Sequence, residues 1–340
     1  MTRPDAGARL LHLGTVVADV VLGVPALPPR GGDVLASAAT VTAGGGFNVL
    51  AAAARQGMPA AYGGAHGTGP LADLTRAALA AEGIAVLLPP VPGLDTGFVI
   101  TLVEPGGERT FVTSPGAEAR LAPAALAAVT ARPQDTVYLS GYALAHKANR
   151  AALLGWLPSL PAAARLVFDP GPLGAQVPAA ALDQVERRAD WWAGNAAEAA
   201  ALTGEATPEA AARALARRTG RAGVLVRTGP DGCLLAGPAA GPGRAGVARV
   251  PGFPAAAVDT TGAGDTHTGV FIAALAVGAD PAAAARRANA AGAISVTRPG
   301  PATAPTAAEL DRFLAQDPAQ NPNWPLCRFS GGRPGAGRSG

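Results

Sequence analysis

The chain has 340 residues, of which 49% are hydrophobic and 15% charged, with a formal net charge of +3 at neutral pH; this length and composition suit one large α/β domain or two smaller ones. No apolar run reaches the roughly 18 residues of a membrane span and the N-terminus lacks a signal-peptide layout, so we expect a soluble, cytoplasmic protein with no membrane partner. The basic residues are almost all arginines scattered through Ala-rich segments, which argues against a nucleic-acid partner.

The first 115 residues are rich in strand signals. Residues 9–24 and 33–45 are β-branched and alternating, and the second run leads into a Gly-rich turn. Helical periodicity then covers "FNVLAAAARQG" and residues 69–83, and both segments end at a glycine suited to cap a helix. Residues 95–116 form two alternating runs joined by "EPGGE", which predicts a β-hairpin.

After about residue 120 the pattern changes to strand followed by helix. Short strands that look buried are predicted at residues 135–141, 164–171, 189–195 and 222–232, with Ala-rich helices between most of them. This alternation indicates a parallel, doubly wound sheet, which binds ligands at the carboxyl ends of its strands. The tail, residues 319–340, is rich in Pro, Gly and Asn, and we expect it to be mostly disordered.

The string "DTTGAGDTHTGVFIAAL", residues 259–275, places small residues at the predicted start of a helix. There the amides of Gly262, Ala263 and Gly264 are unpaired donors, and the helix dipole favours a bound anion. A carboxylate at Asp265 would repel that anion. This repulsion is explained if the Asp265 carboxylate takes a proton from an attacking hydroxyl while the amides hold the charge on a transferring phosphoryl group. The simpler alternative is an acidic residue that favours the helix dipole.

This string resembles the C-terminal signature of the ribokinase-like (PfkB) family of sugar and nucleoside kinases, and the resemblance extends over roughly residues 10–315. It implies an α/β fold with a ribokinase-like doubly wound sheet, a kinase domain over residues 1–318, and a small β-rich lid formed from segments near 12–45 and 95–115. It also implies transfer of the γ-phosphate of MgATP to a hydroxyl of a small sugar, with Asp265 as the catalytic base and residues 262–264 as the anion hole.

The resemblance also implies a substrate site between the lid and the sheet. "AGGGFN", residues 43–48, is similar to the family's N-terminal glycine motif, although alanine replaces its first glycine and Gly45 replaces the lysine of typical ribokinases. The implied substrate-binding residues are Asp19, Gly44, Gly45, Asn48 and Arg109. Three structural alternatives stay open: the glycine turn only begins a helix, Asp19 occupies an edge or bulge position of a strand, and Arg109 is a surface residue of the hairpin.

The implied nucleotide site lies near the later strands. Asn195 and Glu198 are similar to the family's Asn-x-x-Glu motif, which orders Mg²⁺ through water, although the same spacing is that of an N-terminal capping box. "VRTGPDG", residues 226–232, is similar to a nucleotide-phosphate loop, and Asn289 matches a position near the adenine. The implied nucleotide-binding residues are Asn195, Glu198, Arg227, Gly229, Gly232 and Asn289.

The resemblance further implies a monovalent-cation site, with K⁺ as the candidate ion. Its ligands would be Asp259 and Thr261 together with backbone carbonyls near Val296 and Gly300. The same Asp-Thr pair also serves as an ordinary loop cap. We expect His267, two residues after the proposed base, to point away from it and to pack in the core.

Two other functions stay open. A nucleoside kinase of the same fold would require aromatic residues on the lid, for which Phe47, Phe98 and Phe111 are candidates. A non-catalytic sugar-sensing module is less consistent with the sequence, because a sensor has no need of a base at Asp265. A β-rich lid also permits a homodimer formed through it.

Overall fold

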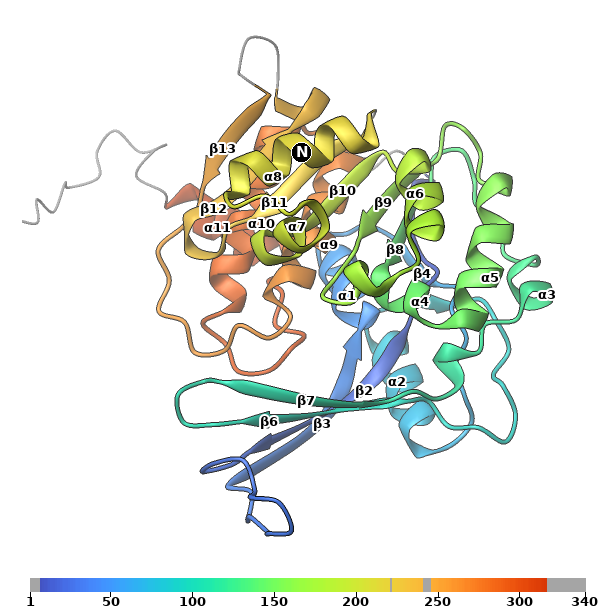
Figure 1. The fold of residues 1–340 in the computed structure, drawn as a ribbon, viewed down its shortest axis with the longest axis vertical. Helices are drawn as coiled ribbons and strands as arrows, with labels where there is room; N and C mark the ends of the chain where they lie inside the picture. The colour runs from blue at the N-terminus through green and yellow to red at the C-terminus, as the bar shows by residue number, and fades with distance from the viewer. Residues whose placement is uncertain (1–6, 221, 241–245, 317–340) are drawn as a thin grey trace, which may run out of the picture.

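A computed structural model describes residues 7–220, 222–240 and 246–316, which form a large α/β sandwich with a smaller sheet projecting from one end (Figure 1). The expected fold, a large sheet flanked by helices with a small β-rich lid, is confirmed. The predicted disordered tail lies outside the described residues.

The large sheet has nine strands among the described residues. In spatial order they are β13 (Val247–Pro251), β12 (Gly232–Ala236), β11 (Gly223–Arg227), β10 (Trp191–Asn195), β9 (Arg165–Asp169), β8 (Thr136–Ser140), β1 (Leu10–His12), β4 (Ala60–Tyr62) and β5 (Ala85–Val86). The pairs from β11 to β5 are parallel, and β12 and β13 add an antiparallel edge. The parallel strands therefore bring their carboxyl ends to one edge of the sheet.

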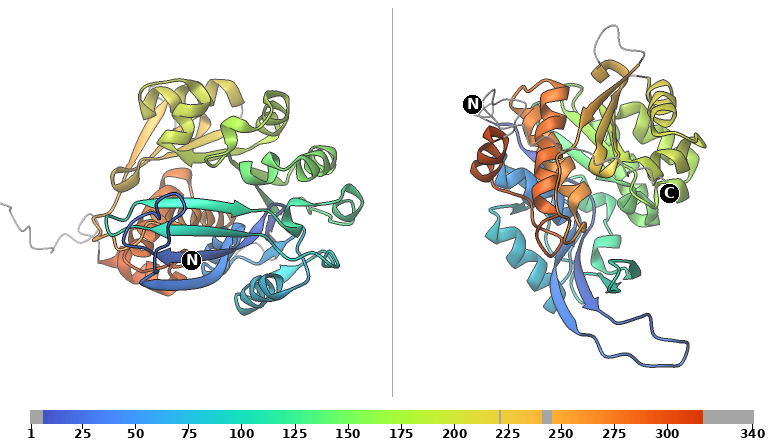
Figure 2. Two further views of the ribbon diagram at one scale, coloured as in Figure 1. Left: turned by 60° about the horizontal axis from the view of Figure 1, so that its bottom comes forward. Right: turned by 90° about the vertical axis from the view of Figure 1, so that its left-hand side faces the viewer.

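Helices cover both faces of this sheet (Figures 1 and 2), each over its own hydrophobic cluster. The first layer contains α1 (Gly46–Arg55), α2 (Pro70–Ala81), α9 (Ala263–Ala276), α10 (Pro281–Ser295) and α11 (Ala307–Ala315). The second contains α3 (Pro123–Leu126), α4 (Gly141–Ala145), α5 (Lys147–Trp156), α6 (Ala179–Arg188), α7 (Ala196–Thr203) and α8 (Pro208–Thr219). Short 3₁₀ turns lie at Ala117–Ala119, Leu157–Ser159, Gly174–Gln176, Gly229–Asp231 and Gly237–Ala240.

The smaller sheet, called the lid here, has the strand order β3-β2-β6-β7. Its strands are β2 (Val16–Gly23), β3 (Ala38–Gly45), β6 (Phe98–Val103) and β7 (Arg109–Ser114). All four lie inside the segments predicted for the lid, and β6 and β7 are the arms of the predicted hairpin. The lid leaves the sandwich at the carboxyl end of β1 and extends away from it (Figure 2).

The single strand predicted over residues 9–24 is interrupted in the structure. Residues 9–24 form two strands in different sheets, β1 in the large sheet and β2 in the lid. The chain changes sheets at residues 13–15, where a Cβ on Gly14 would lie 2.3 Å from the ring of His12. Only glycine lets the backbone pass this buried ring, and the alternating apolar pattern is the same on both sides of the break.

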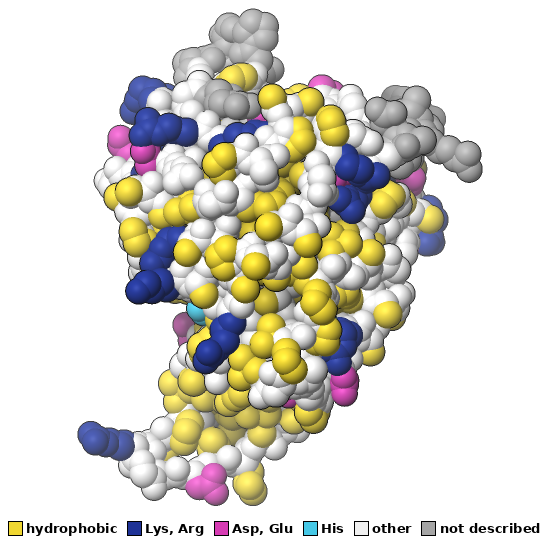
Figure 3. Space-filling view, turned by 90° about the vertical axis from the view of Figure 1, so that its right-hand side faces the viewer, with side chains coloured by type: hydrophobic (Ala, Val, Ile, Leu, Met, Phe, Trp, Pro, Cys, Tyr) yellow, Lys and Arg dark blue, Asp and Glu magenta, His cyan; other side chains and the backbone are white. Residues whose placement is uncertain are grey.

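The described residues contain no helix long and apolar enough to cross a membrane. On the face shown in Figure 3, the Lys and Arg side chains are dispersed over the surface, and the lid projects at the bottom of the view.

Candidate active site

Asp265 lies on the first turn of α9, close to Asn48 at the start of α1. Gly269, one turn further along α9, lets the two helices approach, because a Cβ there would lie 2.5 Å from the carbonyl oxygen of Val49. Asn48 Nδ2 donates a hydrogen bond of 3.1 Å to Asp265 Oδ2, which joins residues 217 positions apart. The fold thus brings a predicted base and a predicted substrate ligand together.

Burial raises the pKa of the Asp265 carboxyl to about 7, and the nearby charge of Asp169 adds to the effect. The hydrogen bond from Asn48 and the charge of Arg227 act in the opposite direction. A carboxyl with a pKa near neutrality is matched to proton abstraction, because it is largely available as a base yet basic enough to take the proton.

The start of α9 has no side-chain cap. Gly262, at the N-cap, has φ 71°, and a Cβ there would lie 2.0 Å from the carbonyl oxygen of Pro301. The amide of Ala263 makes a long contact of 3.3 Å to Thr260 O, and the first helical bond runs from Thr266 N to Gly262 O at 2.8 Å. Donors at such an uncapped helix start are suited to an external anion.

Arg227, at the carboxyl end of β11, lies directly beside this helix start. A Cβ on Gly264 would lie 3.4 Å from Arg227 Nε. The guanidinium donates to Thr268 on α9 at 2.8 Å and to Asp169 at 3.2 Å, and it lies 3.6 Å from a carboxylate oxygen of Glu198. A fixed cation therefore borders the predicted anion hole, and the side chain is only 13% exposed.

Asp169 is a site residue that the sequence analysis did not identify. It ends β9, is buried, and pairs with Arg227, which lies 58 residues later in the chain. The available signal was its position, since it is the polar residue on which a predicted buried strand ends.

The lid brings Asp19 to the same region. A Cβ on Gly44 would lie 1.9 Å from Asp19 Oδ2, so the carboxylate lies against the bare backbone of the glycine motif. Burial raises the pKa of Asp19 to about 6, and its charge contributes to the raised pKa of Asp265. The Oδ1 atom of Asn48 is buried without a hydrogen-bond partner. A polyhydroxyl substrate would supply the partners that these groups lack.

Asn195 and Glu198 form a complete capping box at the start of α7. Asn195 Oδ1 accepts from Glu198 N at 2.8 Å, and Glu198 Oε2 accepts from Asn195 N at 2.7 Å. The pKa of Glu198 is raised, first by burial and then by the charge of Asp169. Oxygen ligands that carry excess negative charge suit a hydrated Mg²⁺, so these residues fit the ion that the resemblance implies. Within the described residues, no group of three or more His, Cys, Asp or Glu side chains is placed to hold a metal ion.

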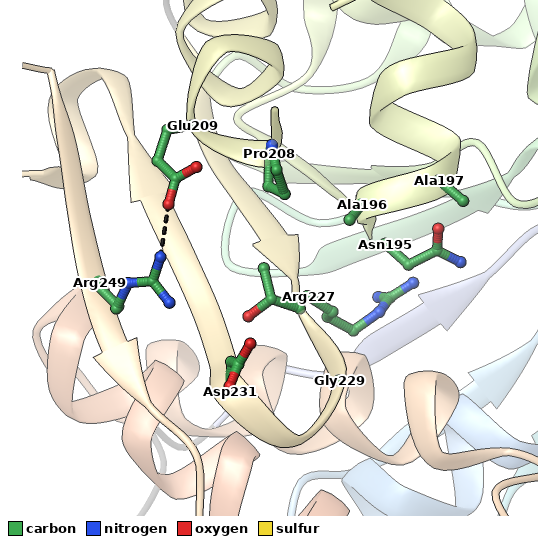
Figure 4. Close-up of a pocket in the computed structure, with 10 residues that line it drawn as sticks. Asn195, Ala196, Ala197, Pro208, Glu209, Arg227, Gly229, Asp231 and Arg249 are labelled. Atoms are coloured by element: carbon green, nitrogen blue, oxygen red, sulfur yellow. Dashed lines mark hydrogen bonds and ion pairs between the residues drawn. The ribbon is translucent and has the colours of Figure 1, made fainter. Parts of the chain in front are cut away.

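Asn195, Arg227 and Gly229 line a cavity of about 530 Å³, bordered further by Arg249 and Glu209 (Figure 4). Gly232 closes the turn of the predicted phosphate loop, because a Cβ there would lie 2.2 Å from Val250 O. The cavity lies at the starts of α7 and α8, and its lining includes the predicted nucleotide-binding residues Asn195, Arg227 and Gly229.

Asn289 is held by hydrogen bonds within the protein, and its predicted position near the adenine stays a prediction. Its amide nitrogen donates to Val250 O and Pro251 O, each at 3.0 Å, and its Oδ1 atom lies 2.9 Å from His267 Nε2. With both amide hydrogens engaged, the side chain links α10 to β13 and α9. His267 is buried, as expected, and burial lowers its pKa to about 3.

Arg109 is paired within the protein, and the prediction that it reaches over the substrate stays a prediction. It extends from the first residue of β7 to the loop before α9, where Nη2 lies 2.5 Å from Asp259 Oδ1 and Nη1 lies 3.0 Å from Thr260 Oγ1. The side chains of Arg109 and Asp259 are about equally buried. One of the two predicted cation ligands is therefore already paired with a positive charge.

Comparison with known proteins agrees with this geometry. The family model described as pfkB family carbohydrate kinase matches residues 8–308. An uncharacterised sugar kinase of Escherichia coli (strain K12) is 32% identical over 88% of this chain and 92% of its own. An ATP-dependent ribose-1-phosphate kinase of Halopiger xanaduensis is 31% identical, over 91% of this chain and 98% of its own. The ribokinase of Thermotoga maritima has a TM-score of 0.75 and 26% identity, covering 90% of this chain and 99% of its own. The chain therefore belongs to the pfkB family of carbohydrate kinases and is a phosphotransferase that acts on a sugar or nucleoside hydroxyl.

Proposed function

We propose that the protein transfers the γ-phosphate of ATP to a hydroxyl of a small sugar, with Asp265 as the catalytic base. The observation that carries this proposal is the position of Asp265. Its buried carboxyl lies at the uncapped start of α9, bonded to Asn48 and close to the cation of Arg227. Base, anion hole and fixed positive charge thus meet at one point.

In this mechanism Asp19 and Asn48 orient the acceptor sugar through hydrogen bonds to its hydroxyls. Asp265 takes the proton from the attacking hydroxyl, and the amides of residues 262–264 hold the charge that develops on the transferring phosphoryl group. Arg227 adds a positive charge that is already in place before the reaction. Mg²⁺, held through water by Asn195 and Glu198, would neutralise phosphate charge.

We propose a sugar as the acceptor, and of the three aromatic residues considered for a nucleoside base only Phe111, which is 58% exposed on the Asp19 face of the lid, is placed where it could contact one. Of the aromatic residues considered for a base-binding lid, Phe47 is buried in the core. Phe98 pairs with Ala18, so it lies on the opposite face of the lid from Asp19. The curated relatives described above are named as kinases of a sugar and of ribose 1-phosphate, and we propose a pentose or pentose derivative as the first substrate to test.

The experiment is ADP release from MgATP across pentoses, hexoses, ribose 1-phosphate, keto-deoxy sugar acids and nucleosides. Asp265→Asn should lower kcat for the accepted substrate by about 10²- to 10⁴-fold, because it removes the proton acceptor and retains the shape. Asp183→Asn, on the exposed face of α6, is the matched control and should leave kcat unchanged. Equal turnover in Asp265→Asn and wild type would remove the base assignment.

A homodimer through the lid stays a prediction. The lid face opposite Asp19 carries Val41 and Val112, which are 46% and 56% exposed. Exposed apolar side chains on a projecting sheet are suited to pairing with a second copy.

A further inference from the structure

The ion pair between Arg109 and Asp259 joins the lid to the loop before α9. Arg109 is opposite Val103 at the turn end of the β6–β7 hairpin, on the same face of the lid as Asp19, whose row is Asp19, Val99 and Thr113. Figure 1 shows the tip of this hairpin beneath the orange loops near the start of α9. The contact spans 150 positions in the chain, so it forms only when the lid and the sandwich are correctly placed.

Both carboxylate oxygens of Asp259 accept hydrogen bonds from within the protein. Its Oδ1 atom accepts from Thr261 N at 2.8 Å as well as from Arg109, and its Oδ2 atom accepts from Gly300 N at 3.0 Å. These hydrogen bonds and the charge of Arg109 outweigh the effect of burial and hold the pKa of Asp259 below its usual value. The carboxylate is therefore held by Arg109, Thr261 and Gly300 within the protein.

A second oxygen of the predicted cation loop is also engaged. The carbonyl oxygen of Val296 accepts from Val258 N at 2.7 Å and from Asp259 N at 3.1 Å. A carbonyl oxygen has two lone pairs, and both are occupied here. A monovalent cation bound at this loop would need to displace a protein donor from Val296 O and would lie against the positive charge of Arg109 at Asp259, so the residues present do not fit the K⁺ site that the resemblance implies.

We propose that Arg109 takes the place of a monovalent cation in this protein: its guanidinium, delivered by the lid, is the positive charge that organises the loop before α9. Asp259 in turn accepts a hydrogen bond from the amide of Thr261, the residue next to Gly262, and so fixes the backbone at the start of α9. Arg109 is a positioning residue, because it acts on the anion hole through Asp259. When the lid closes, the pairing of Arg109 with Asp259 also orders the anion hole, and K⁺ is not required.

The first test needs no variant and no substrate. The thermal midpoint of the wild-type protein is measured in KCl and in tetramethylammonium chloride of equal ionic strength, since the larger ion cannot enter a protein cation site. We expect equal midpoints. A higher midpoint in K⁺ that saturates with concentration would show a bound ion and overturn the proposal. This result is independent of whether the proposed sugar kinase activity is correct.

The second test compares Arg109→Met with Arg30→Met, an exposed arginine of the same lid. Arg109→Met should lower kcat about 10-fold or more in tetramethylammonium with a smaller change in the KM for sugar, because a charge-assisted pair is lost. K⁺ should restore part of this loss. Arg109→Lys should retain part of the wild-type rate, and Arg30→Met should behave as wild type.

Hydrogen exchange provides a readout besides activity. The peptide over residues 104–114 should exchange faster in Arg109→Met than in wild type or Arg30→Met, because the hairpin loses its anchor. Asp259→Asn should produce the same change, and the double variant should add little to either. Unchanged exchange in both single variants, or tenfold activation of the wild type by K⁺, would contradict the proposal. If Arg109→Met does not fold, the wild-type thermal measurement alone decides.

Discussion

The starts of α7 and α9 carry similar sequence features and are built differently. Each helix has an acidic residue in its first turn, Glu198 in α7 and Asp265 in α9. In α7 the carboxylate bonds back to its own N-cap, Asn195, and closes the helix end. In α9 the N-cap is Gly262, which has no side chain, and the carboxylate instead bonds to Asn48 on another helix.

This difference is the one we expect between a carboxylate that caps its own helix and the proposed catalytic base. A carboxylate that caps its own helix has satisfied local donors. A carboxylate at an uncapped helix start leaves those donors free for a ligand and is itself held at the mouth of the site. Arg227 lies between the two ends and contacts both, at 3.6 Å from Glu198 and near the backbone of Gly264. The two helix starts therefore form one electrostatic unit.

The largest expected effect follows from removing the charge that joins the two ends. Arg227→Met should lower kcat/KM about 10²-fold or more, because a preorganised positive charge next to the transferring group is lost. It also leaves Asp169, Glu198 and Asp265 without a counter-charge, so the pKa of Asp265 rises further above about 7.

The measurement is steady-state kinetics at several pH values, below the thermal midpoint of the variant. Arg187→Met, an exposed arginine on α6, is the control for loss of an arginine as such. Full activity of Arg227→Met at neutral pH would show that the anion hole functions without this cation.

A smaller effect distinguishes the charge of Glu198 from its capping bond. Glu198→Gln retains an oxygen that can accept from Asn195 N, so the thermal midpoint should change little. Its apparent affinity for Mg²⁺ should fall about 10-fold, because the ordering carboxylate is gone. The check is a titration of activity with Mg²⁺ at fixed ATP. An unchanged Mg²⁺ midpoint would leave only the structural role for Glu198.

The sequence predicted the large sheet, its helices and the lid, and it gave no signal for contacts between residues that are distant in the chain. The string around Asp265 is informative because the proposed base and the proposed anion hole are consecutive residues. Asp169 carries no comparable signal, since its partner Arg227 lies on another strand. The pair of Arg109 and Asp259 likewise depends on where the lid meets the sandwich, which no local pattern encodes.

The pH dependence tests whether Asp265 is the reactive member of the comparison. Activity needs its deprotonated form, so kcat/KM should rise with pH through about 7 and level off above. Asp19→Asn removes a negative charge that raises this pKa, so the acidic limb should move to lower pH by less than about one unit. Asp183→Asn should leave the limb in place. A limb near the ordinary carboxyl range in the wild type would contradict the assignment.

The smallest expected effect concerns the cap of α7 itself. Asn195→Ala should cost about 1 kcal/mol and lower the thermal midpoint by about 1 to 2 °C, because the helix loses its N-cap. The matched control is Thr306→Ala in α11, which has the same kind of capping box with Glu309 but lies away from the site. Both variants should lose similar stability, and only Asn195→Ala should also weaken the response to Mg²⁺. If the two variants responded equally to Mg²⁺, Asn195 would only cap α7 and would have no role in binding Mg²⁺. The start of α7 would then be an ordinary capped helix end.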